Sequence, residues 1–135
     1  MLTHLRAAQK DLRLNQQEQD LYKRHLSNLW TPSGVDNPDG SRSTLYQFSE
    51  RGPDGRHYNI PTVWDGKILS PDEALDRVEE TGWDKFPAYK TPEEADARYQ
   101  QMHNYMDKDA VDYWTVRGRT GPDAVVPSLL DGRFR

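Results

Sequence analysis

Two short stretches of this sequence bring carboxylates together and are the first candidates for chemistry. SPDEALDRV spans Ser70–Val78, and TPEEADARY spans Thr91–Tyr99. Each stretch holds two adjacent acids, and paired carboxylates can act as general acid and base. The same acids also stand where the start of a helix favours negative charge. The neighbouring residues decide between a catalytic carboxylate pair and the start of a helix.

The neighbours of these acids follow the rules for starting a helix. Ser70 and Thr91 are typical N-cap residues, and each precedes a Pro at the first helical position, where no amide donor is missed. Glu73 and Glu94 stand three positions after the caps, as in a capping box. The similarity is too short for a structural repeat. We therefore predict two helix starts and no catalytic site.

The other reactive residue types are scattered along the chain. The histidines do not form the spaced pairs typical of zinc sites, and the sequence contains no Cys. The glycines form no phosphate-binding string, and the short acidic runs lack the closing Glu of a calcium loop. We expect no enzyme, no cofactor and no metal site. The histidines are His4, His25, His57 and His103.

Charge is unevenly distributed along a chain whose net charge is −4. An acidic centre lies between two weakly basic ends, and phosphate binding requires clustered Lys and Arg, so nucleic acid is disfavoured as a partner. Arg117 and Arg119 could contact DNA or an acidic protein surface. Two Arg are too few for strong phosphate binding, so we favour contact with a protein. No apolar run approaches the roughly 20 residues that cross a bilayer.

Residues 1–30 are predicted to form a long helical arm. The segment from Leu2 to Leu29 lacks Pro and Gly, and from Leu5 onward a thin apolar stripe recurs every three or four positions. Such a helix could pack on its own domain or along a partner. We expect partner contacts because the stripe gains little from burial against a small domain. The residues expected to make them are Leu5, Leu12, Tyr22 and Leu26.

The middle of the chain is predicted to be a linker at 31–42 followed by a small α+β domain at 43–110. Strands are expected at 43–50, 57–64 and 67–69, the last two joined by Asp65 and Gly66, a pair typical of a type I′ turn. They would form a three-stranded antiparallel meander that packs against the two helices.

Residues 111–135 mix Gly and Pro with apolar anchors. We expect an extended C-terminal arm that lies along a partner or along its own domain, because a solvated tail needs fewer apolar residues. The residues expected to contact a partner are Trp114, Arg117, Arg119, Leu129, Leu130 and Phe134.

Several short motifs follow one another over about residues 37–109. They are NPDGSRST (37–44), GRHYNIPTVWDGKILSPDEA (55–74), TG (81–82), KFPAYKTPEEADA (85–97) and His103. This string resembles a small domain that recurs in virion proteins of tailed bacteriophages, often inside larger internal or tail-associated proteins. No catalytic residues are known to us for that domain, so the resemblance implies none here.

The resemblance implies a structural component of the virion, made in the host cytoplasm. It would bind other virion proteins through its terminal arms, in several copies within a symmetric assembly. Portal, neck, tail and internal proteins are the partners this implies. Two alternatives remain: an accessory protein associated with a lytic enzyme, and a regulatory binding protein outside the virion.

Overall fold

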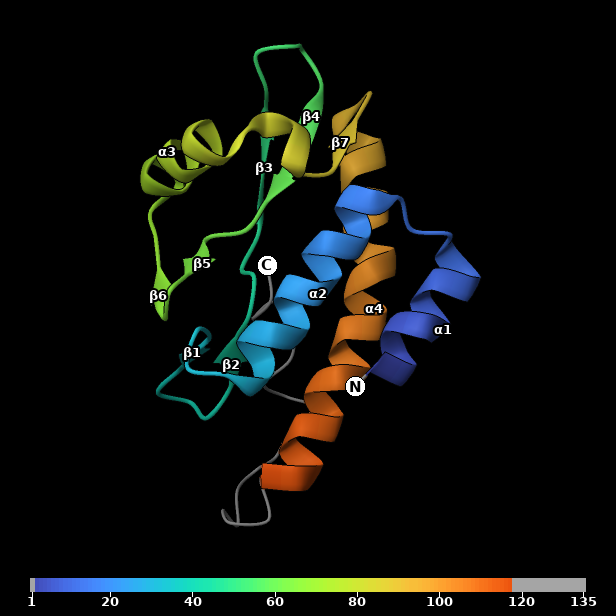
Figure 1. The fold of residues 1–135 in the computed structure, drawn as a ribbon, viewed down its shortest axis with the longest axis vertical. Helices are drawn as coiled ribbons and strands as arrows, with labels where there is room; N and C mark the ends of the chain where they lie inside the picture. Colours follow the sequence, from blue (N-terminus) through green and yellow to red (C-terminus); the bar gives the residue numbers. More distant parts are fainter. Residues whose placement is uncertain (1, 118–135) are drawn as a thin grey trace.

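The computed structural model describes residues 2–117 of the 135-residue chain, with side chains described for residues 5–115 (Figure 1). The described part is a mixed α+β fold, which confirms the predicted class. The helices are α1 (Leu2–Leu12), α2 (Gln16–Trp30), α3 (Pro71–Thr81), the short 3₁₀ helix η1 (Trp83–Lys85) and α4 (Pro92–Arg117). The strands are β1 (Val35–Asp36), β2 (Arg42–Ser43), β3 (Phe48–Arg51), β4 (His57–Ile60), β5 (Val63–Trp64), β6 (Lys67–Ile68) and β7 (Ala88–Tyr89).

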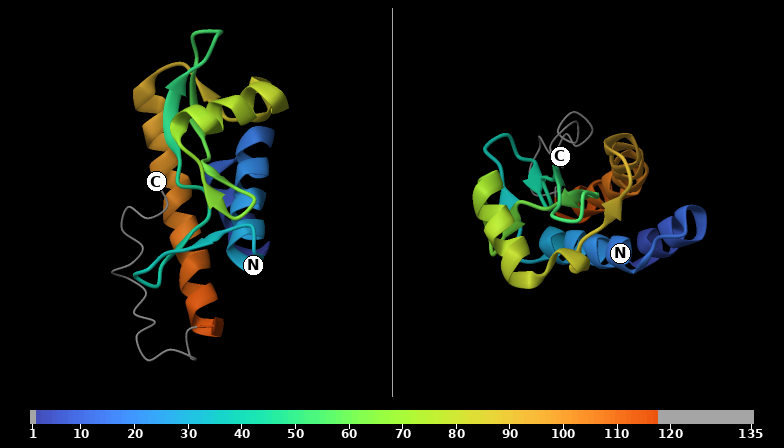
Figure 2. Two further views of the ribbon diagram at one scale, coloured as in Figure 1. Left: turned by 90° about the vertical axis from the view of Figure 1, so that its left-hand side faces the viewer. Right: turned by 90° about the horizontal axis from the view of Figure 1, so that it is seen from above.

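The helices α1, α2 and α4 form one layer of the molecule (Figures 1 and 2). Their apolar faces meet in a core cluster that also receives Leu45 from the loop before β3. Burial of such faces supplies most of the stability of short helices. The buried members of this cluster are Ala8, Leu14, Leu21, Tyr22, Leu26, Leu45, Met102 and Met106.

A second core cluster lies between the main sheet and α3. Tyr58 and Ile60 of β4 pack against Ala74 and Val78 of α3, with Phe86 closing the cluster. Figure 1 shows α3 and α1 on opposite sides of the molecule, with α2 between them. The two clusters are therefore separate, and α2 lies where they approach one another.

Both predicted hairpins form, but they belong to two separate sheets, so the prediction of one three-stranded meander is wrong. β3 pairs antiparallel with β4, but the other neighbour of β4 is β7, and β5 pairs with β6 in a separate hairpin. The chain leaves the sheet at Pro61, which has no amide to donate. The next amides, of Thr62 and Val63, instead donate to the carbonyl of Leu45 at 2.8 and 3.3 Å.

The predicted N-terminal arm is two helices that belong to the core. Arg13 adopts a left-handed backbone conformation, with φ of 52°, and ends α1. Asn15 then caps α2: its side chain accepts from the Glu18 amide at 2.8 Å, and the Asn15 amide donates to Glu18 at 3.0 Å. This capping box starts a new helix within a run of good helix formers.

The segments predicted as a linker and as an extended arm also differ from expectation. Part of 31–42 folds into the β1–β2 hairpin against the C-terminal end of α2. The Arg42 guanidinium donates to the carbonyls of Asn28, Leu29 and Thr31, which lack partners within the helix. Helix α4 continues through Arg117, because no Gly or Pro interrupts the chain before Gly118. Across residues 2–117, no helix is both long and apolar enough to span a bilayer.

Both predicted helix starts are confirmed. The Ser70 hydroxyl accepts from the Glu73 amide at 3.2 Å, while the Ser70 amide donates to the Glu73 carboxylate at 3.0 Å. The Thr91 hydroxyl accepts from the Glu94 amide at 3.1 Å. These acids therefore serve the helix ends, as the sequence indicated.

We predict that Ser70→Ala lowers the free energy of unfolding by about 1 kcal/mol, because the first turn of α3 loses its side-chain acceptor. Urea unfolding at neutral pH measures the change. Ser27→Ala is the matched control, since Ser27 is exposed within α2 and should shift stability by less than about 0.5 kcal/mol. Equal effects of the two substitutions would contradict the capping role.

Candidate functional site

Two of the residues expected to contact a partner, Tyr22 and Leu26, pack inside the protein instead. Tyr22 is fully buried and Leu26 is 7% exposed, so the prediction of partner contacts by these two is wrong, and they stabilise the layer formed by α1, α2 and α4. Leu5 and Leu12 pack against the same cluster but are only half-buried, and partner contacts by them stay a prediction. The thin stripe on α1 and α2 gains enough from burial because α4 presents Met102 and Met106 to it.

The C-terminal candidates lie partly outside the described residues. Trp114 is half-buried on α4, with its ring 5.3 Å from that of Tyr113. Arg117 is the last residue of α4. Arg119, Leu129, Leu130 and Phe134 fall in residues 118–135, outside the described part of the chain.

A buried polar network joins α2, α4 and the segment before β3. The Tyr22 hydroxyl donates to Asp109 Oδ2 at 2.6 Å, and His25 Nε2 lies 3.2 Å from the same oxygen. On its other side, His25 Nδ1 lies 2.7 Å from the Thr44 hydroxyl. Asn28 then donates to the Thr44 carbonyl at 2.8 Å. Three segments distant in sequence are thus held in one register.

Tyr, His and Asp in hydrogen-bond contact are typical of catalytic sites, but here they are inaccessible. Tyr22 and His25 are fully buried, and Asp109 is 2% exposed, so a substrate cannot reach them in this conformation. Burial, reinforced by the hydrogen bond to Asp109, raises the pKa of Tyr22 far above its ordinary value. The phenol stays protonated, and the group acts as a structural donor.

A second network surrounds Glu18 at the start of α2. Its carboxylate accepts two hydrogen bonds from the Arg98 guanidinium, each 2.9 Å long, and one of 2.6 Å from the Tyr89 hydroxyl. Burial alone would raise the pKa of Glu18, but the hydrogen bonds from Arg98, Tyr89 and the Asn15 amide outweigh it and hold that pKa below its usual value. Arg98 also donates to the Leu12 carbonyl, which ties the end of α1 to α4.

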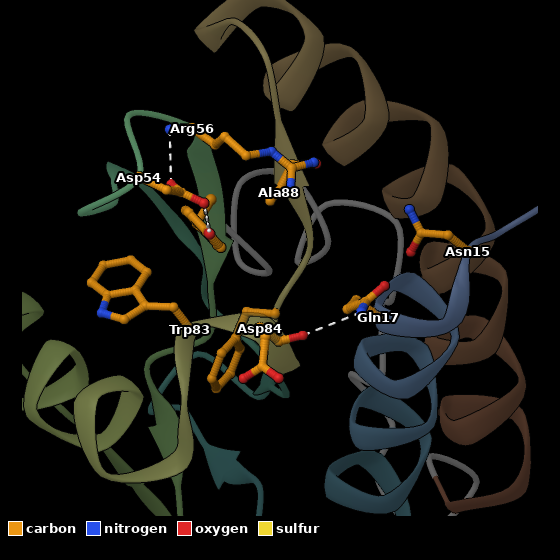
Figure 3. Close-up of a pocket in the computed structure, with 9 residues that line it drawn as sticks. Asn15, Gln17, Asp54, Arg56, Trp83, Asp84 and Ala88 are labelled. Atoms are coloured by element: carbon orange, nitrogen blue, oxygen red, sulfur yellow. Dashed lines mark hydrogen bonds between the residues drawn. The ribbon is translucent and has the colours of Figure 1, made fainter.

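A surface hollow of about 360 Å³ opens between the β3–β4 turn, η1 and the start of α2 (Figure 3). Gln17 donates to the Asp84 carbonyl at 3.2 Å across its floor. Arg56 donates to the Ala88 carbonyl at 3.2 Å and extends its guanidinium away from Asp54. The hollow therefore offers both hydrogen-bond donors and hydrogen-bond acceptors to a polar partner.

Tyr58 and Asp54, at one side of this hollow, each keep one protonation state near neutral pH. The Tyr58 hydroxyl donates to Asp54 Oδ2 at 2.7 Å. Burial, together with the charge on Asp54, raises the pKa of Tyr58 to about 12. The same hydrogen bond, with one from the Arg56 amide, lowers the pKa of Asp54. Tyr58 stays protonated and Asp54 charged, so the pair suits recognition better than proton transfer.

Comparison with known proteins gives no assignment: no family model, curated protein or solved structure matches this chain. Within the described residues, no group of three or more His, Asp and Glu side chains is placed to hold a metal ion.

Sequence reasoning missed the buried acids Glu18 and Asp109 and the half-buried Arg98. One signal was available, since Asn15 followed by Glu18 has the spacing of a capping box and marks the start of α2. No comparable sequence signal links Glu18 to Arg98, because Arg98 lies eighty positions further along the chain. Such pairing depends on the packing of α2 against α4.

We predict that Glu18→Gln lowers the free energy of unfolding by about 3 kcal/mol at neutral pH, because Arg98 is left near a neutral amide in a largely buried site. Since the folded-state pKa of Glu18 lies below its unfolded value of 4.5, the stabilisation is present above pH 4.5 and is lost as the pH falls through the folded pKa. Urea unfolding of both proteins over this range measures the difference.

Glu93→Gln is the control, since Glu93 is exposed in the first turn of α4. A difference between Glu18→Gln and the unsubstituted protein that stayed constant from pH 7 to acid would contradict a charged Glu18.

Proposed function

We propose that this chain is a structural component of a tailed-bacteriophage particle that binds neighbouring particle proteins. Two lines support the proposal. The ordered motifs of residues 37–109 resemble a domain of such virion proteins, and they run from the turn between β1 and β2 through most of α4. The fold, in addition, uses its buried ionisable groups to join its own helices and strands.

The observation that carries the proposal is the end of α4. This helix of 26 residues runs past the ends of α1 and α2 (Figure 1). Its last turns carry Val111, which is 42% exposed, and the half-buried Trp114. Exposed apolar groups that gather at the end of a projecting helix are typical of protein contacts. The binding surface we propose is this end of α4 together with Arg117, Arg119, Leu129, Leu130 and Phe134.

With Tyr22 and Leu26 of α2 buried in the core, the end of α4 is the docking surface that we propose. Binding through several copies in a ring or shell would repeat the contact and raise its total strength. The sequence resemblance supports portal, neck, tail or internal proteins as neighbours, and host cytoplasm as the place of synthesis.

We predict that purified particles contain the chain in a fixed copy number, and that Val111→Asp lowers its incorporation at least about tenfold, equivalent to about 1.4 kcal/mol of contact energy. Mass spectrometry with labelled standards measures copies per particle. Ile68→Asp is the matched control, because Ile68 is also 42% exposed but lies on β6, away from α4.

Urea unfolding of both variants separates lost contacts from lost stability. Absence of the chain from particles would overturn the proposed role. Equal incorporation of the two variants would overturn the proposed surface.

A further inference from the structure

Arg24, in the middle of α2, is a cation that forms no ion pair with the described residues. Its guanidinium lies over the ring of Trp64, with Cζ 3.7 Å from the ring centroid. Its Nε is buried and donates to no acceptor, and no carboxylate of residues 5–115 forms an ion pair with it. Burial lowers the pKa of Arg24, partly offset by the charge of Asp65. A buried donor without an acceptor requires an explanation.

Arg24 lines a hollow of about 280 Å³, whose other lining residues come from α2, the end of α3, η1 and the residue that follows η1. One part of the wall is apolar and consists of Leu21 and Phe86. The other part is polar, with Arg24 and the exposed Lys85 supplying two positive charges. Thr81, at the end of α3, adds a hydroxyl.

One acid, Asp20, also lines the hollow, and its Oδ1 accepts a hydrogen bond of 2.8 Å from the neutral side-chain amide of Gln16. Its carboxylate offsets one of the two positive charges of Arg24 and Lys85. Arg77 of α3 lies 5.9 Å from the centroid of the Trp64 ring, which Arg24 also covers, but Arg77 does not line the hollow. The lining therefore has a net positive charge beside an apolar wall, an arrangement that favours a bound anion.

We propose that this hollow binds a carboxylate that carries an apolar group. The carboxylate accepts hydrogen bonds from Arg24, whose planar guanidinium matches it in shape, and Lys85 adds attraction at the rim. The apolar group packs on Leu21 and Phe86. Two sources have this chemistry: the C-terminal residue of a peptide and a small free carboxylic acid. The site is distinct from the end of α4 and does not depend on the proposed role.

The full chain is titrated with N-acetyl-leucine, with N-acetyl-leucinamide as the uncharged match, while the Trp indole signals are followed by NMR. We expect N-acetyl-leucine to bind with a dissociation constant near 1 mM. The amide should bind at least about tenfold more weakly, because it lacks the charge that Arg24 requires. A longer peptide that ends in leucine and binds more tightly than N-acetyl-leucine identifies a peptide C-terminus as the source. Equal binding identifies a free acid.

Arg24→Gln should weaken binding of N-acetyl-leucine at least about tenfold, and Lys85→Gln should weaken it severalfold. Arg51→Gln is the matched control, because Arg51 is exposed on β3, away from the hollow, and should bind as the unsubstituted protein does. Thermal unfolding verifies that each variant is folded. Lys85 is exposed, so its variant keeps the test valid if Arg24→Gln does not fold.

Three results would each overturn the proposal. The first is the absence of any shift at about 10 mM N-acetyl-leucine. The second is equal binding of the acid and the amide, or of Lys85→Gln and the unsubstituted protein. The third is displacement of N-acetyl-leucine by inorganic phosphate at equal concentration, which would indicate a site for any anion.

Discussion

Helix α2 buries three polar side chains that find hydrogen-bond partners on the face it turns to the rest of the protein. Glu18, His25 and Asn28 are all less than 7% exposed. A buried polar group left unpaired costs about 1–3 kcal/mol, and more when charged. The partners come from three other parts of the chain: Tyr89 of β7, Arg98 and Asp109 of α4, and Thr44 before β3. Pairing these groups fixes where each element lies around α2.

This constraint holds ionisable groups of the interior in fixed protonation states. The pKa of Tyr22 is raised by burial and by Asp109, and the pKa of Glu18 is lowered by its donors, so both remain in one protonation state near neutral pH. Apolar packing alone is non-directional. The hydrogen bonds therefore specify the register of helices whose apolar stripe is thin.

The sequence predicts the elements whose signals are local. The starts of α3 and α4 follow from Ser70 and Thr91 with their glutamates, and the β5–β6 turn follows from Asp65 and Gly66, both with positive φ. The break between α1 and α2 was missed, although Asn15 and Glu18 signal it. The pairing of β7 with β4, and of Glu18 with Arg98, could not be predicted, because each joins distant segments through tertiary packing. The unpaired cation Arg24 likewise emerges only when α2 meets Trp64.

Native-state hydrogen exchange tests most directly whether α2 is the element on which the fold depends. If it is, the slowest amides of α2, α4 and β4 exchange with one common free energy, equal to that of global unfolding. The buried backbone of α2 would then open only when its partners open. Exchange of α2 through a separate opening of much lower free energy, while β4 and α4 stay protected, would contradict the account and make α1 and α2 a detachable arm.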